Sequence, residues 1–193
     1  MRQLANGLYF ASNYEDALSV EEAQVSTLRR LSAPEHVMLD AQSNLALTYR
    51  NVGRHESALG MLRDVYSGTL ELFGEDDRRT LLAASNYAAS LNDQNNYEEL
   101  KPMLRKTIPV ARRVLGENNE VTLRVKLTYA MTLYGDPGAT LDDLREAVMT
   151  LEDVVRIARR VLGGSHPLTA QFEEALRRSR AALHARETPS TSG

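Results

Sequence analysis

Apolar side chains recur along this chain with the spacing of one helix face. The first clear example runs from residue 38 to Gly53, which ends it. Its apolar positions are Leu39, Leu45, Ala46 and Tyr49. Apolar residues three and four positions apart indicate an amphipathic helix, whereas strict alternation would indicate a strand. Since no segment alternates in that way, the pattern predicts an all-α chain.

A second helical pattern follows the first after a short break. Its apolar stripe comprises Ala58, Leu62, Val65, Leu72 and Phe73, and a matching later stripe comprises Leu100, Leu104, Ile108, Val114 and Leu115. Gly74 follows the earlier stripe and suits a C-terminal cap with positive φ. Thr140, with Asp143 three residues on, is the predicted N-cap of a later helix. Short breaks between such helices predict antiparallel pairs.

One phrase is written twice in this chain, as RVLGENNEVTL and RVLGGSHPLTA. The glycine of this phrase is Gly116 in one copy and Gly163 in the other, and Gly74 of LFGED occupies the same place earlier, so the steps are 42 and 47 residues. A fixed period of this length is the signature of a repeat protein. The longer step has a local cause, because the turn-forming residues 136–138 lie in an insertion that we expect to be a loop.

The period divides the chain into helix pairs within one predicted domain, residues 1–187. The predicted units are 1–33, 34–74, 75–116 and 117–163, followed by a capping helix at 166–187 and a flexible tail at 188–193. A single helix pair cannot bury its apolar stripe, but stacked pairs bury a continuous one. Arg177 occupies a place where other units have alanine, so we expect this helix to close the stack. The first helix lacks about one turn, which suggests part of a larger repeat protein or an end that docks elsewhere.

Composition narrows the function classes. The 193 residues carry a net charge of −3 and include no cysteine, which excludes disulfides and thiolate metal sites. Mild acidity argues against a nucleic-acid partner, which would favour a basic face. No apolar run approaches the roughly 20 residues that span a bilayer. We therefore expect a cytoplasmic protein with no nucleic-acid or membrane partner.

Catalytic and metal-binding patterns are missing from the sequence. His55 begins HESAL, but the second histidine of the metalloprotease helix motif is replaced by Leu59. Acidic pairs such as Asp142-Asp143 lie near helix starts, where negative charge favourably meets the helix dipole. We expect no enzyme activity, no cofactor and no metal.

The repeats resemble tetratricopeptide repeats of the 42-residue type found in kinesin light chain. The matching phrases are NLALTYRNVGRHESAL, NNYEELKPMLRKTIPVARRVLGEN and RRVLGGSHPLT. The resemblance implies an all-α, right-handed solenoid of antiparallel helix pairs. It departs from the family pattern at His55, which replaces an aromatic residue, and at Leu100, which replaces an alanine. The His-Pro pair is intact only at residues 166–167.

The resemblance also implies a binding site for an extended peptide on the concave side, which the first helix of each pair lines. We therefore expect the function of a protein-interaction scaffold. A carboxamide both donates and accepts hydrogen bonds, so it suits the backbone of a peptide of any sequence. The candidate peptide-binding residues are Arg2, Asn6, Tyr9, Asp40, Asn44, Leu47, Arg50, Asn51, Ser85, Asn86, Asn92, Arg124, Thr128, Met131 and Tyr134.

Alternatives remain open for the partner. A peptide with acidic residues and an apolar anchor would suit the arginines and apolar side chains of this face. Relatives that capture a C-terminal carboxylate use basic residues and asparagines; Arg2, Asn6 and Asn44 match, but Leu82 and Asn86 stand where two basic residues are needed. The repeat face could instead mediate self-association as a homo-oligomer.

Overall fold

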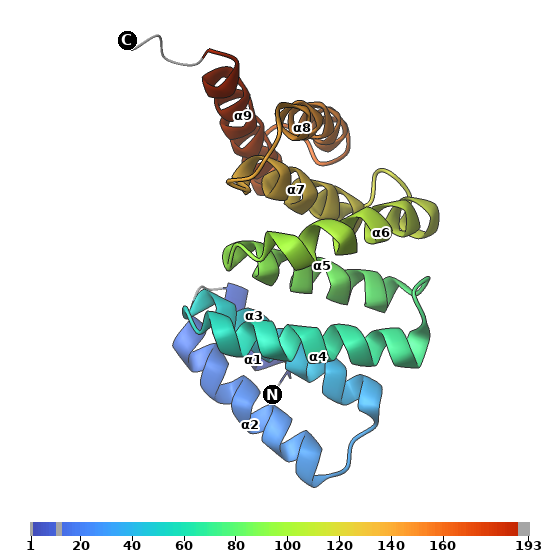
Figure 1. Cartoon of the computed structure of the whole chain (residues 1–193). Helices are drawn as coiled ribbons and strands as arrows, with labels where there is room; N and C mark the ends of the chain where they lie inside the picture. The colour runs from blue at the N-terminus through green and yellow to red at the C-terminus, as the bar shows by residue number, and fades with distance from the viewer. Residues whose placement is uncertain (1, 11–12, 189–193) are drawn as a thin grey trace. The chain divides into compact units, whose positions relative to one another are not determined.

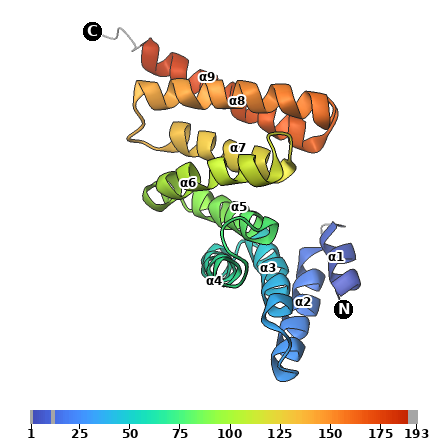
Figure 2. The same cartoon turned by 90° about the vertical axis from the view of Figure 1, so that its right-hand side faces the viewer.

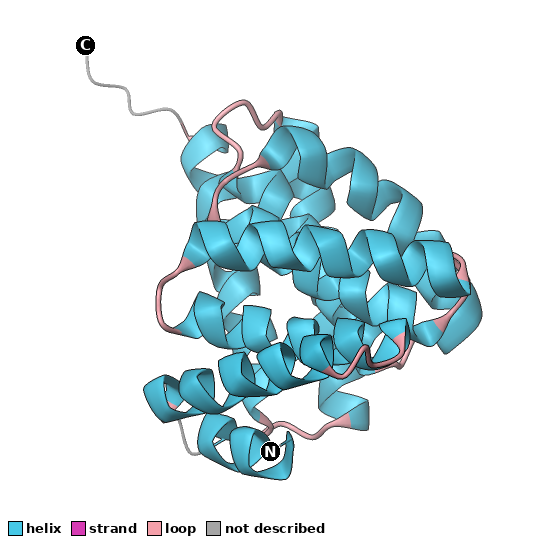
Figure 3. Ribbon diagram, turned by 90° about the horizontal axis from the view of Figure 1, so that it is seen from below, coloured by secondary structure: helices cyan, strands magenta, loops and turns pink. Residues whose placement is uncertain are grey.

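The computed structural model describes residues 2–10 and 13–188, without the side chains of Arg2, Asn6 and Phe10. Figure 3 shows helices joined by loops and no strand within this described part. Thr188 is the only residue of the predicted flexible tail that is described, and the others lie outside the described residues. The predicted all-α class is confirmed for the part described.

Two compact units make up the structure, Met1–Gln94 and Asn95–Gly193. The first contains α1 (Arg2–Phe10), α2 (Tyr14–Arg30), α3 (Glu35–Asn51), α4 (His55–Phe73) and α5 (Arg78–Asp93). The second contains α6 (Tyr97–Leu115), α7 (Glu120–Gly135), α8 (Leu141–Val161) and α9 (Pro167–Glu187). Their boundary falls in the turn between α5 and α6. A single domain over 1–187 stays a prediction.

In the first unit each helix packs against the next, and α3 also packs against α5 (Figures 1 and 2). One buried cluster joins α2 to α3 through Leu18, Val25, Ala41 and Leu45. A second joins α3, α4 and α5 through Leu39, Val65 and Ala83. Because every helix presents its apolar stripe to a neighbour, the core is a continuous layer of small clusters, as stacking of repeats requires.

The second unit follows the same rule, with α6 to α9 packed in sequence and α7 also against α9. Its fully buried side chains include Leu104, Leu123, Leu133, Leu151 and Phe172. The side chain of Arg177 on α9 is 77% exposed and pairs with Glu174 on the same helix. No described helix therefore covers Arg177, and the closing position expected for α9 stays a prediction.

Polar side chains at fixed repeat positions begin the first helix of several pairs. Asp77 accepts a hydrogen bond from the backbone N–H of Arg79, and Asn119 accepts one from Val121. His166 does the same for Leu168 through Nδ1. These caps satisfy N–H groups that the helix itself leaves unpaired. The departures from His-Pro in the earlier repeats are tolerated because Asp and Asn supply the same acceptor.

A repeated threonine ties the start of one pair to the end of the preceding helix. Oγ1 of Thr80 donates to the carbonyl of Thr69 at 3.0 Å, and Oγ1 of Thr122 donates to the carbonyl of Ala111 at 3.3 Å. Both threonines are buried. The bonds satisfy hydroxyls that burial would otherwise leave unpaired, which costs about 1–3 kcal/mol each.

The predicted N-cap of α8 is confirmed. Oγ1 of Thr140 accepts from the N–H of Asp143 at 3.1 Å, and Oδ2 of Asp143 accepts from the N–H of Thr140 at 2.9 Å. The insertion before it forms the predicted loop, in which Asp136 accepts from the N–H of Gly138. This reciprocal cap fixes where α8 begins after the longer connection.

Gly74 has φ 81° and forms the C-cap of α4 that its position predicts. At positive φ a side chain clashes with its own backbone, so only glycine is comfortable there. Gly60 lies inside α4, and a Cβ there would meet no atom within 4 Å. The backbone at position 74 therefore requires glycine, whereas the helical position 60 can accept a side chain.

We predict that Gly74→Ala lowers the free energy of unfolding by about 1 kcal/mol or more, because alanine is strained at positive φ. Gly60→Ala serves as the matched control and raises it by roughly 0.5–1 kcal/mol, since alanine is the better helix former. Urea denaturation followed by circular dichroism measures both. Equal shifts in the two variants would contradict this account.

Glu21 is a carboxyl group buried in α2 with only 3% of the residue exposed. Burial raises its pKa, and the nearby hydroxyl of Thr48 on α3 opposes the shift by a smaller amount. Neither Oε2 of Glu21 nor Oγ1 of Thr48 makes a hydrogen bond of standard geometry to the described residues. The folded state therefore favours the protonated acid, and its stabilisation is lost as pH rises from the unfolded value through the folded one.

We predict that Glu21→Gln raises the free energy of unfolding at pH 7 by about 1 kcal/mol, because it removes a charge that burial leaves poorly solvated. The gain shrinks below pH 4.5, the ordinary carboxyl value, where Glu21 is already neutral. Denaturation across pH 4 to 8 measures the difference, with Glu71→Gln on the exposed side of α4 as the control. A gain independent of pH would show that charge is not its cause.

Candidate functional site

One face of α3 carries four of the predicted peptide-binding residues. Asp40, Asn44, Leu47 and Asn51 follow one another at steps of four, three and four, so they form a single stripe along the helix. Asp40 and Asn51 are exposed, and the two middle residues are half-buried. The stripe is therefore accessible along its length and partly sheltered at its centre.

At one side the stripe meets α1. Nδ2 of Asn51 donates to the hydroxyl oxygen of Tyr9 at 2.9 Å and to the carbonyl of Leu47 at 3.0 Å. Tyr9 also packs edge-on against Tyr14 of α2, with ring centroids 5.4 Å apart. Two predicted site residues on separate helices are thus brought together. The hydrogen bond between Asn51 and Tyr9 holds α1 beside α3.

At the other side the stripe meets α5. The guanidinium of Arg50 pairs with both carboxylate oxygens of Asp93, with Nη2 3.2 Å from Oδ1. Near the other ends, Arg79 of α5 has a raised pKa, chiefly through its bond to Asp77 and to a lesser extent through the nearby charge of Asp40. The starts of α3 and α5 thus lie together, as do their ends, so the two helices run in the same direction.

The parallel course of α3 and α5 places Asn44 and Asn86 at equivalent positions, 42 residues apart. Both are half-buried. Neither carboxamide has a hydrogen-bond partner in the described part of the chain. The two helices contact each other, and packed helices generally lie about 8–10 Å apart. Asn92, also half-buried, lies in the last turn of α5.

Two of the predicted contacts offer almost no surface. Ser85 is 5% exposed and Thr128 is 7% exposed. The Thr128 hydroxyl donates to the carbonyl of Arg124 in its own helix at 3.0 Å. Thr128 is therefore not available to a peptide in the way that its sequence position predicts, because α7 is buried on that side. The side chains of Arg2 and Asn6 lie outside the described residues.

The remaining predicted residues lie on α7 in the second unit. Arg124 is exposed and pairs with Glu120, one turn earlier, at 2.9 Å. Met131 and Tyr134 are half-buried. Burial raises the pKa of Tyr134, and nearby Arg178 opposes that shift. Both described arginines of the predicted site, Arg50 and Arg124, are ion-paired, and a preference for acidic peptides stays a prediction.

Leu82 was singled out in the sequence only as a missing basic residue. Its position four before Asn86 places it on the same stripe of α5, and 46% of the residue is exposed. The face of α3 and α5 thus carries an apolar contact that the sequence interpretation missed. The available signal was the equivalence of Leu82 to Asp40, a position exposed in the neighbouring repeat.

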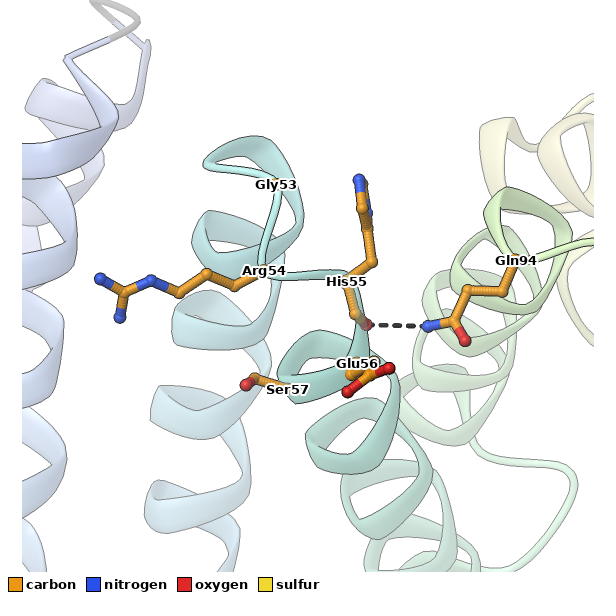
Figure 4. A pocket seen from close by; sticks show the side chains of 6 residues that line it. All are labelled: Gly53, Arg54, His55, Glu56, Ser57 and Gln94. Atoms are coloured by element: carbon orange, nitrogen blue, oxygen red, sulfur yellow. Dashed lines mark hydrogen bonds between the residues drawn. The ribbon is translucent and has the colours of Figure 1, made fainter.

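A hollow of about 660 Å³ lies beside this face, at the turn between α3 and α4. Figure 4 shows Nε2 of Gln94 donating to the carbonyl of His55 (2.9 Å), while Arg54 points away from Gln94. Arg54 instead lies 3.7 Å from Glu22. In the next repeat the place of His55 is taken by Tyr97, whose hydroxyl donates to Asn95 at 2.5 Å. An equivalent hollow of about 540 Å³ lies beside Tyr97, so the smaller imidazole of His55 is not what creates the hollow.

Other chemistry has little support in the described residues. They contain no group of three or more His, Asp or Glu side chains able to hold a metal ion. None of the helices described has an apolar stretch long enough to cross a membrane.

Comparison with solved structures identifies proteins of the same fold. A kinesin light chain-type protein of Podosopora anserina with nearly identical TPR-like repeats superimposes with a TM-score of 0.73 at 19% identity, covering 96% of this chain and 86% of that one. A variant of the same protein with one substitution gives 0.76 at 20% identity, covering 96% and 85%. BtubC (BKLC) from P. vanneervenii gives 0.68 at 13% identity, covering 98% and 80%. These likenesses confirm the predicted solenoid fold class of the kinesin light chain type.

Sequence comparison gives the family. No curated protein matches the chain. The family model described as tetratricopeptide repeat matches residues 38–79, 80–120 and 139–168. These three segments cover more than half of the 193 residues. The chain therefore belongs to the tetratricopeptide repeat family.

Proposed function

We propose that the face shared by α3 and α5 binds an extended segment of another protein. Tetratricopeptide repeats are protein-interaction scaffolds, which gives the general role. The observation that carries the specific proposal is the pair of half-buried carboxamides, Asn44 and Asn86, at equivalent places on parallel helices. A half-buried amide that lacks an internal partner is available for a ligand, and satisfying it there is favourable.

The surrounding contacts divide the face into two kinds of residue. Two contacts hold α1, α3 and α5 together and keep the face in one geometry. They are the hydrogen bond from Asn51 to Tyr9 and the ion pair of Arg50 with Asp93. A preorganised face loses less entropy when it binds. These four residues therefore act as supports, and the carboxamides make the direct contacts.

The spacing of the carboxamides sets the geometry of the ligand. An extended chain advances about 3.3 Å per residue. Side chains on two helices 8–10 Å apart would therefore contact peptide backbone groups about three residues apart. Leu47 and Leu82 add apolar surface to the same face. The proposed ligand is thus a segment without regular structure whose backbone is bound at two points, with an apolar side chain as anchor and no requirement for acidic residues.

Cytoplasmic residence and the absence of catalysis fit a scaffold and belong to the same proposal. Self-association through this face is the alternative, and it would appear as a concentration-dependent mass in light scattering that the Asn44→Ala/Asn86→Ala variant abolishes.

We predict that Asn44→Ala/Asn86→Ala weakens peptide binding about tenfold or more, since each lost hydrogen bond contributes about 0.5–1.5 kcal/mol. Linear peptides selected from a random library against the wild-type protein provide the probe, and isothermal titration calorimetry measures their affinity. Stability should be unchanged, because no described residue bonds to either carboxamide.

The matched control is Gln24→Ala/Gln42→Ala, which removes two carboxamides of α2 and α3 that lie off this stripe. It should bind like the wild type. Methylating two backbone nitrogens of a selected peptide, about three residues apart, should reproduce the loss seen with the asparagine variant. Unchanged affinity in the Asn44→Ala/Asn86→Ala variant would disprove the proposed site.

A further inference from the structure

The second unit contains an open hollow of about 470 Å³ that no part of the proposed peptide site uses. It lies where α6 ends, beside the side of α7 that carries Lys126 and the last two turns of α8. Four cations line it: Arg112, Lys126, Arg156 and Arg160. Two carboxylates, Glu117 and Asp153, line it as well. With all six groups ionised, the lining has a net charge of +2.

Lys126 organises the carboxylates. This lysine is 9% exposed, and its Nζ lies 2.7 Å from Glu117 Oε2 and 3.2 Å from Asp153 Oδ2. The bond to Lys126 lowers the pKa of Glu117. Burial alone would raise the pKa of Asp153, but Lys126 and Arg156 outweigh it and the net shift is downward. The carboxylates therefore stay charged near neutral pH, and both are occupied by the cations around them.

The arginines keep accessible guanidinium groups. Arg112 pairs with Glu117 and Arg156 pairs with Asp153, yet their side chains are 54% and 68% exposed. Arg160 differs, because its Nη2 donates at 3.0 Å to the neutral carboxamide oxygen of Asn118. It forms no ion pair with any described carboxylate. Among the four cations of the hollow, Arg160 is therefore the one that no described carboxylate neutralises through a direct bond.

We propose that this hollow binds the dianion of a phosphate monoester. Its net charge matches a dianion, and guanidinium groups bind phosphate oxygens through paired hydrogen bonds. Arg156 and Arg160 are four residues apart, so they project from the same side of α8. Arg112 approaches from α6, and the side-chain amide of Asn118 adds a neutral donor. Ile157, 5% exposed, forms part of the apolar lining.

The position of two of these arginines at helix ends gives a reason for their charge that does not involve a ligand. Arg112 and Arg160 lie in the last turns of α6 and α8, where cations interact favourably with the helix dipole. That effect does not require the cations of two helices to converge on one hollow. The comparable residues Arg29 and Arg30, in the last turn of α2, line none of the hollows described. They provide a control with the same loss of charge at a helix end.

The test titrates wild-type protein with inorganic phosphate at constant ionic strength, following arginine Nε–H and backbone amide signals by NMR. We expect saturable shifts at residues lining the hollow. Arg156→Gln/Arg160→Gln should weaken binding about tenfold or more, since hydrogen bonds to charged groups are the strong ones. Arg29→Gln/Arg30→Gln should leave it unchanged, and the folded state of each variant is checked by its thermal midpoint.

Asp153→Asn provides a test in the opposite direction. It removes one negative charge from the lining and should tighten phosphate binding several-fold. A phosphoserine peptide and its unphosphorylated form then distinguish the sources of the phosphate. If the phosphopeptide binds more tightly than inorganic phosphate, the ligand is a modified protein segment, and equal affinities indicate a small phosphate compound.

The proposal is overturned if wild-type protein shows no saturable shift. It is equally overturned if both double-arginine variants lose the same affinity, because binding would then reflect only overall charge. The asparagine residues of the peptide face are unaffected by these changes, so this result is independent of the proposed peptide site.

Discussion

A helical pair in this chain has more apolar surface than its two helices can bury against each other, and this constraint governs the structure. Leu39 of α3 is buried against Val65 of α4 and Ala83 of α5. Because Ala83 belongs to the next repeat, one helix pair alone would leave part of Leu39 exposed to water. Burial at about 25 cal/mol per Å² therefore accumulates only when neighbouring pairs are present. The side chain of Arg177 on α9 is exposed, and no described helix packs over it.

Stacking leaves the helix ends with polar groups that need partners, and the repeat solves this locally. Asp77, Asn119 and His166 cap α5, α7 and α9 with different side chains that each supply an acceptor atom. The buried hydroxyls of Thr80 and Thr122 are satisfied by carbonyls eleven residues earlier. Oε2 of Glu21 and Oγ1 of Thr48 are exceptions among the described residues, because these buried atoms have no hydrogen-bond partner. The repeats thus tolerate wide variation in sequence wherever hydrogen-bonding capacity is kept.

The polar surfaces outside the core differ in which side chains are already bonded to one another. Beside α3, ion pairs and hydrogen bonds consume Arg50, Asp93, Asn51 and Tyr9, while equivalent carboxamides on α3 and α5 stay unpaired within the described residues. In the second unit, Lys126 draws two carboxylates together and leaves an excess of guanidinium groups around a hollow. A surface that binds neutral backbone and one that binds an anion can therefore occur on the same repeat scaffold, because each depends on which side chains pair internally.

The sequence by itself determined the helices, the period and the caps, because these depend on residues close along the chain. Gly74, the Thr140–Asp143 box and the loop at 136–138 were all predictable from local chemistry. It also placed Asn44 and Asn86 at equivalent positions. Tertiary structure alone decided the state of other side chains: it paired Arg50 with Asp93, buried Ser85 and Thr128, and exposed Leu82. These outcomes depend on contacts between helices distant in sequence or on how each helix is rotated against its neighbours, and periodicity does not fix either.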